Sequence, residues 1–153
     1  MPIEARLSNY KRNNFLIYMA VCIAAAAWFG YDGYFNKKFK EAHTDAEGNP
    51  DSVYVFNQKA PPFFVGAAVL LGAYLLVIRN RRLVAGEDEL ILSSGEKISY
   101  DSIQKIDKTH FSKKGFFVIS YRNKDGTDVD LKLSDRKHDN LAAILDHLVA
   151  KIS

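Results

Sequence analysis

The chain has 153 residues, of which 48% are hydrophobic and 25% charged, and its formal net charge at pH 7 is +3. A length of this order accommodates about one domain, and the weakly basic balance argues against a nucleic-acid-binding protein. The one cysteine, Cys22, excludes a disulfide framework and a thiolate metal cluster.

The whole-chain average hides two apolar blocks that contain no charged residue, at 15–31 and 60–78. Each is close to the ~20 residues that a helix needs to cross a hydrocarbon core. The pattern predicts two transmembrane helices, a basic tail at 1–14 and an outside loop at 32–59. Buried core helices of a soluble protein are one alternative. A cleavable secretory signal is a second alternative for the first block, because basic residues precede it and four alanines lie near its end.

Basic residues flank the outer ends of the two blocks. Arg6, Lys11 and Arg12 precede the first block, and Arg79, Arg81 and Arg82 directly follow the second. The loop between the blocks carries charges of both signs. Because positively charged flanks stay on the cytoplasmic side, we expect a hairpin in the bacterial inner membrane with both termini in the cytoplasm.

The loop is predicted to begin with an interfacial extension of the first helix, since tyrosines and phenylalanines favour headgroup depth. The sequence "SVYVF" at 52–56 indicates a short extended segment, and Pro61 and Pro62 are expected at the start of the second helix. Between them, Asp45, Glu47, Asn49 and Asp51 alternate as in a calcium loop. The glycine and the distal glutamate of such a loop are missing, so a solvated turn is expected and no metal site is predicted.

Residues 79–153 predict a soluble module rich in β-strands. Short β-branched and aromatic segments at 88–92, 96–100, 104–111, 115–122 and 127–133 are separated by turn sequences. In the last segment Val129, Leu131 and Leu133 alternate with polar residues, which is typical of a half-buried strand. Segment 116–119 is apolar on both faces and is expected to lie centrally or to face a partner. From Asp139 onward, helical spacing predicts an amphipathic closing helix.

The run "GEKISYDSIQKIDKTHFSKKGFFVISYRNKDGTDVDLKL" followed by "NLAAILDHLVAKI" resembles the bacterial pleckstrin-homology-like domains. The resemblance covers about 83–152 and includes an I-x-[FY]-x-x-I element at Ile98, Tyr100 and Ile103. It implies a curled antiparallel sheet, or partly open barrel, whose open end is plugged by the terminal helix, and a tether to a membrane hairpin. The expected fold class is therefore α+β: two transmembrane helices followed by a PH-like sheet capped by a C-terminal helix.

Six basic side chains gather around the "SKKG" turn and the neighbouring strand ends, namely Lys105, Lys108, Lys113, Lys114, Arg122 and Lys124. Near a bilayer such charges attract anionic headgroups by about 1 kcal/mol each. Aspartates are interleaved with these residues, so a solvated face of mixed sign is the alternative. Within the spans, Ala20, Ala24 and Ala27 share one face and Ala68 and Gly72 another. Small residues let membrane helices approach closely, so these faces are expected to pack within the hairpin or against another membrane protein.

The four histidines lack metal-site spacing, the serines lack a nucleophile context, and no glycine-rich phosphate loop is present. We therefore expect no enzyme and no cofactor. The leading functional hypothesis is a non-catalytic interaction or scaffold protein, an accessory subunit of a larger inner-membrane complex or a self-associating chain, surrounded by membrane lipids. A lipid-responsive sensor is the alternative, and an enzyme with a site shared between subunits is the third.

Overall fold

A computed structural model describes residues 1–152, and the chain divides into two compact units. One unit combines Met1–Arg12 with the described residues from Val77 onward, and we call it the module. The other unit, Asn13–Leu76, contains most of the two long helices, and we call it the hairpin.

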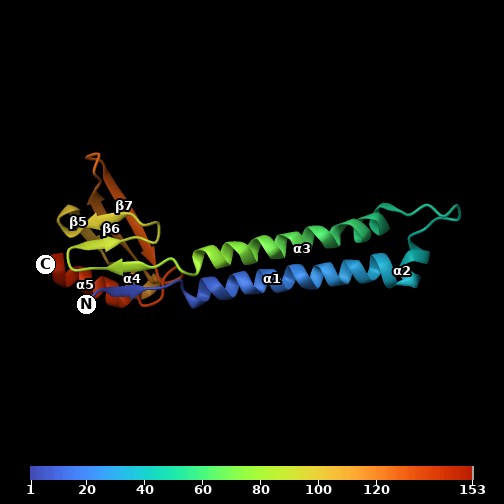
Figure 1. Cartoon of the computed structure of the whole chain (residues 1–153), viewed down its shortest axis with the longest axis horizontal. Helices are drawn as coiled ribbons and strands as arrows, with labels where there is room; N and C mark the ends of the chain where they lie inside the picture. The colour runs from blue at the N-terminus through green and yellow to red at the C-terminus, as the bar shows by residue number, and fades with distance from the viewer. Residues whose placement is uncertain (153) are drawn as a thin grey trace. The chain divides into compact units, whose positions relative to one another are not determined.

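The hairpin is an antiparallel pair of long helices joined through a short one (Figure 1). α1 covers Asn9–Gly30 and continues as one π-helical turn over Tyr31–Phe35, α2 covers Lys37–Ala42, and α3 covers Ser52–Ile78. The two predicted apolar helices are confirmed, and both are longer than their uncharged blocks. The predicted extension of the first helix ends at Asn36, whose side chain accepts the Phe39 N–H and starts α2 as a separate helix.

The prediction of an extended segment at 52–56 is wrong, because α3 already begins at Ser52. Asp51 caps this helix: its carboxylate accepts the Tyr54 N–H at 2.8 Å and its carbonyl accepts the Val55 N–H at 3.1 Å. Such a cap satisfies donors that a helix start leaves open and outweighs the strand preference of the two valines. As a result, Pro61 and Pro62 lie inside α3 and not at its start.

The module holds seven strands in two antiparallel sheets. The first sheet has the order β1-β2-β3-β4 and the second the order β5-β6-β7. The strands are β1 Ile3–Ala5, β2 Leu83–Ala85, β3 Glu89–Ile91, β4 Lys97–Ser99, β5 Ile103–Asp107, β6 Phe116–Arg122 and β7 Asp128–Ser134. A 3-10 turn at Tyr100–Ser102 separates the sheets, and a single helical turn, α4, covers Phe111–Lys114. The five predicted strand segments are confirmed as β3 to β7, and β6 is central in its sheet, as expected.

The first strand, β1, precedes the hairpin in the chain, whereas the other strands follow it. β1 pairs with β2 in antiparallel register, with Ile3 opposite Ala85 and Ala5 opposite Leu83, and Ala5 is fully buried. The sequence analysis treated residues 1–14 as a tail and missed this strand. The hairpin is thus an insertion between two strands that are neighbours in one sheet.

The module core lies between the sheets and the closing helix α5, Leu141–Ile152. Phe117 and Ile119 of β6 are fully buried, as are Ile144 and Leu148 of α5. β7 alternates as predicted, since its charged side chains are exposed while Leu133 is only 4% exposed. Helix α5 packs on β1 and β2, so the terminal helix and the N-terminal strand share one core.

Candidate functional site

The two units differ sharply in how they treat large apolar side chains. Among the described residues, those that stay exposed, apart from Met1, lie in the hairpin or in residues adjoining it, and none lies between Leu83 and Ile152. Trp28, Phe63 and Leu70 are 71%, 78% and 72% exposed. A contiguous apolar surface of this extent marks contact with another apolar phase or with a protein.

Both long helices meet the length and composition that a membrane span requires. In the most apolar stretches of Asn9–Phe35 and Ser52–Ile78, only 6% and 11% of the residues are buried. The core helix of a soluble protein would bury a face instead. The alternative of two buried core helices therefore does not describe this chain.

The helices approach closely where the proline pair interrupts the hydrogen bonding of α3. Prolines at 61 and 62 leave the carbonyls of Asn57 and Gln58 without their usual helical donors. The Tyr34 hydroxyl donates to the Gln58 carbonyl at 2.8 Å. A Cβ on Gly33 would lie 2.7 Å from the Asn57 carbonyl oxygen, so only glycine permits this approach. The prolines, the glycine and the tyrosine together form one helix contact.

The two predicted small-residue faces differ in burial: one packs within the hairpin and the other is exposed. Ala68 is buried and Gly72 lies against Met19, so this face packs against α1 within the hairpin. Ala20, Ala24 and Ala27 are exposed, and Ala26 is the alanine of α1 that is buried. Aromatic pairs also link the two helices. The ring centroids of Phe15 and Tyr74 lie 5.4 Å apart, and those of Phe29 and Phe64 lie 5.6 Å apart.

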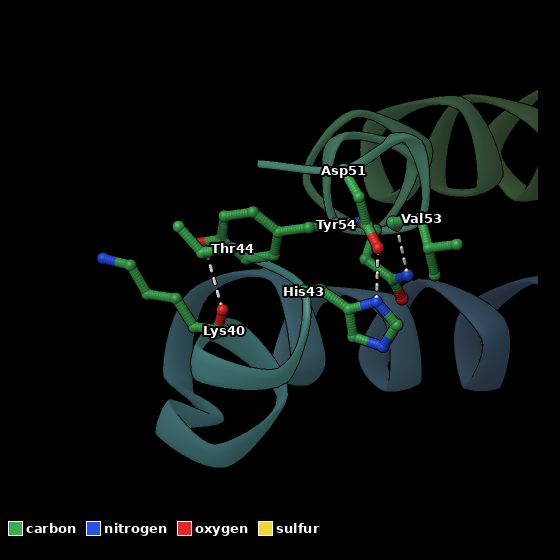
Figure 2. Close-up of polar contacts among 7 residues, drawn as sticks. Lys40, His43, Thr44, Asp51, Val53 and Tyr54 are labelled. Carbon is green, nitrogen blue, oxygen red and sulfur yellow. Dashed lines mark hydrogen bonds and ion pairs between the residues drawn. The ribbon is translucent and has the colours of Figure 1, made fainter. Parts of the chain in front are cut away.

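The tip of the hairpin is closed by a hydrogen bond between His43 and Asp51 (Figure 2). The Nδ1 atom of His43, at the end of α2, lies 2.7 Å from a carboxylate oxygen of Asp51, while the other oxygen caps α3. The Tyr54 N–H bond, followed by the bond to His43, lowers the pKa of Asp51. The Thr44 hydroxyl donates to the Lys40 carbonyl at 2.6 Å and finishes α2. These contacts orient the two helices and bring together no catalytic set.

The calcium-like pattern at the tip is used for backbone turns. The Asp45 carboxylate accepts the N–H groups of Glu47 and Asn49 at 3.0 and 2.8 Å, and these bonds lower its pKa. Asp51 is engaged with His43 and with α3. Within residues 1–152 no group of three or more His, Cys, Asp or Glu side chains is arranged to hold a metal ion.

The six basic residues predicted as one patch are distributed over three cavities. Lys105 and Lys108 line a cavity of about 230 Å³ with Val149 and Ile152, and Arg122 and Lys124 line one of about 410 Å³. Lys113 and Lys114 line a third cavity of about 340 Å³. β6 separates the second and third groups by its seven residues, roughly 20 Å at 3.3 Å per residue. Lys113 and Lys114 therefore lie at one end of β6 and Arg122 and Lys124 at the other, so the six residues do not all line one cavity. Their contact with lipid headgroups or a partner stays a prediction.

Charge balance distinguishes these cavities. In the 410 Å³ cavity, Lys97 pairs with Glu89 at 2.7 Å, and Arg122 pairs with Asp128 at 3.0 Å. The hydrogen bond from Arg122 lowers the pKa of Asp128. The 340 Å³ cavity is lined by four basic side chains, an aromatic ring and a hydroxyl, namely Lys113, Lys114, Lys132, Arg136, Phe116 and Ser134, and we call it the basic cavity. Lys132 and Arg136 were not among the predicted residues. They lie beside α4 because Phe116 pairs with Ser134 across the sheet.

The loop after β7 binds the start of α1. The Ser8 N–H donates to the Lys137 carbonyl at 3.0 Å, the Ser8 hydroxyl donates to the Arg136 carbonyl, and the Asn9 N–H donates to Asp139 at 3.1 Å. In the same loop, burial followed by the charges of Lys11 and Lys137 lowers the pKa of His138. The first turn of α1 is thus fixed by the module.

Among the other predicted residues, Arg79, Arg81 and Arg82 follow α3 and are exposed, and Arg82 pairs with Glu4 at 2.8 Å. Comparison of the chain with protein-family models, with curated proteins and with solved structures finds no match.

Proposed function

We propose that the chain is a two-span protein of the cytoplasmic membrane that works without catalysis, as an accessory or scaffolding subunit of a larger assembly or of a homo-oligomer. The concentration of exposed large apolar side chains in the hairpin and the residues adjoining it, with Met1 as the exception, carries this proposal. Leaving one such side chain in water costs about 1.5–3 kcal/mol relative to burial, so acyl chains are the favoured surroundings.

The direct test is the behaviour of the purified chain after detergent removal. The full chain is expected to aggregate in plain buffer and to remain dispersed in nanodiscs. Sedimentation velocity measures both states. A monodisperse chain in buffer without any amphiphile overturns the membrane assignment.

Pairing of β1 with β2 supports a hairpin whose two ends lie on the same side. Residues 1–12 and those from Val77 onward belong to one folded unit, so the chain enters and leaves the hairpin from that unit. The basic flanks assign this side to the cytoplasm. Removal of the first helix as a secretory signal would also remove β1. A reporter inserted at Gly48 is expected outside, and one fused at residue 153 inside. Equal accessibility of both contradicts the topology.

The PH-like resemblance remains part of the proposal. Two antiparallel sheets, with α5 buried against β1 and β2, fit a curled sheet plugged by a terminal helix. In this chain the membrane hairpin takes the place of the loop between β1 and β2. An experimental structure of the full chain in which α5 lies apart from the sheets would contradict the resemblance.

The exposed alanine face of α1 is the part of the hairpin that we assign to contact with another membrane helix. Ala20, Ala24 and Ala27 are not used within the hairpin, and small residues permit close helix approach where lipid gives no hydrophobic drive. The mass of the particle isolated in mild detergent is expected to exceed that of a monomer. Ala24→Leu should reduce this mass, whereas Val69→Leu, on an exposed position of α3, should not. A monomer in every mild detergent refutes the subunit role.

A further inference from the structure

The basic cavity combines four cations that come from three parts of the module. Lys113 and Lys114 lie in the single turn α4, Lys132 and Ser134 at the end of β7, and Arg136 in the loop that follows. Pairing of Phe116 with Ser134 brings these segments together. The cavity of about 340 Å³ lies in the size range of small-ligand sites, about 300–1,000 Å³.

None of the four cations is in an ion pair among residues 1–152. Aromatic rings position two of them instead: Lys132 Nζ lies 3.8 Å from the centre of the Phe116 ring, and the Arg136 guanidinium lies 5.8 Å from that of Tyr10. A ring face attracts a cation without accepting its conventional hydrogen bonds. The donors of both side chains therefore stay available to an acceptor in the cavity.

One carboxylate lies nearby and must be counted. The Asp135 side chain packs against Gly115, where a Cβ would clash with its carboxylate. Gly115 adopts φ +66, so it both ends α4 and leaves this space. Asp135 is not among the residues that line the cavity. Four positive charges against one peripheral negative charge leave a net positive site.

We propose that the basic cavity binds a phosphate ester. Arg136 has the planar donor fork that matches two phosphate oxygens, while the three lysines act as point charges. The Ser134 Oγ accepts a hydrogen bond from the backbone N–H of Arg136 at 3.3 Å. The hydroxyl proton of Ser134 is therefore available for another oxygen. Phe116 forms the apolar wall.

The position of Tyr10 indicates the source of the phosphate. Arg136 lines the cavity and also contacts Tyr10, in the first turn of α1. Tyr10 lies only five residues before the uncharged block at 15–31, about 7.5 Å along a helix. If that block enters the bilayer, which rests on the proposed function, Arg136 is close to the headgroups. A phosphate of an anionic phospholipid is then the nearest ligand, whereas the binding chemistry itself is shared with free phosphate.

The test uses the full chain in a neutral detergent. Native mass spectrometry measures retention of phosphatidylglycerol against phosphatidylcholine at equal concentration, and calorimetric titration measures binding of inorganic phosphate. Each charge near a lipid surface changes affinity about fivefold, so Lys132→Gln with Arg136→Gln should reduce anionic-lipid retention about 25-fold. Lys113→Gln with Lys114→Gln provides a second, independent pair. Lys105→Gln with Lys108→Gln, in the 230 Å³ cavity, is the matched control.

Retention of anionic lipid that both cavity pairs reduce and the control pair preserves supports the site with a lipid source. Phosphate binding without lipid preference supports the site with a soluble source, and then only the placement at headgroup depth fails. Equal losses in the control pair, or no binding of either ligand by the wild type, overturn the proposal. Because the phosphate titration does not depend on membrane insertion, it separates failure of the site from failure of the proposed membrane function.

Discussion

Replacing Gly33 by alanine tests a close helix contact in the hairpin. A Cβ at this position would lie 2.7, 2.8 and 2.9 Å from backbone atoms of Asn57 and Gln58. Backbone atoms cannot rotate away as a side-chain end can, so the two helices must separate. Overpacking of this kind costs about 1–3 kcal/mol, while removing a helical glycine returns about 0.5–1 kcal/mol. The difference between these two terms is about 0–2.5 kcal/mol, so we expect Gly33→Ala to lose on the order of 1 kcal/mol of unfolding free energy.

Gly66 provides the matched control because it lies in α3 with nothing within 4 Å of its Cβ position. Gly66→Ala should therefore keep or raise the stability of the hairpin. Gly72 is intermediate: its Cβ would approach the Met19 methyl group at 3.2 Å, and that flexible end can move. The order of stability expected is Gly66→Ala, then Gly72→Ala, then Gly33→Ala.

Unfolding of the full chain by sodium dodecyl sulfate in neutral micelles measures this order. Trp28 is the only tryptophan and lies in α1, so its fluorescence reports on the hairpin. A Gly33→Ala protein that unfolds at the same denaturant fraction as Gly66→Ala would refute the close approach of the two helices.

Three further predictions concern other contacts. Tyr34→Phe removes the donor to the Gln58 carbonyl, 2.8 Å away, and should cost about 0.5–1.5 kcal/mol in the same denaturant titration; no loss would show that the proline-freed carbonyl finds another donor. Phe117→Ala empties the centre of the module, where the ring is fully buried, and should lower the unfolding free energy by about 3–5 kcal/mol; a loss below 1 kcal/mol, measured by circular dichroism, would contradict the placement of the core. The lowered pKa of His138 means that the unfolded chain binds the proton more readily, so stability is fully present above about pH 6.5 and declines as the pH falls toward the folded pKa. His138→Phe should flatten the melting temperature between pH 7 and 5, and an unchanged slope would assign the pH dependence to other groups.

Local sequence patterns were sufficient for most of the module. The alternation of Val129, Leu131 and Leu133 predicted β7, and the doubly apolar segment 116–119 predicted a central strand. The closing helix followed from its spacing, with Leu141, Ile144, Leu145 and Leu148 buried. These predictions succeeded because each face of an element meets one environment along its whole length, so the residue period records that environment.

Non-local pairing and helix capping could not be predicted from local sequence patterns. β1 has three residues and pairs with a strand about eighty positions later, so no window of the sequence contains both partners. Helix α3 begins early because one aspartate supplies its cap, which overrides the strand preference of "SVYVF". Lys132 and Arg136 join Lys113 only through the register of β6 and β7, and this register depends on the whole sheet. The sequence therefore predicted two of the four cations of the basic cavity, Lys113 and Lys114, but not the cavity itself.

The hairpin is inserted between two paired strands, so the start of α1 is held within the module. Ala5 is opposite Leu83 in the sheet, and Ser8 and Asn9 are hydrogen-bonded to the loop at 136–139. A displacement of the start of α1 must therefore break these bonds or move β1 with it, and β1 shares its core with α5. The basic cavity adjoins the same loop through Arg136. A ligand bound to Arg136 would therefore contact the same loop whose carbonyls accept the hydrogen bonds of Ser8.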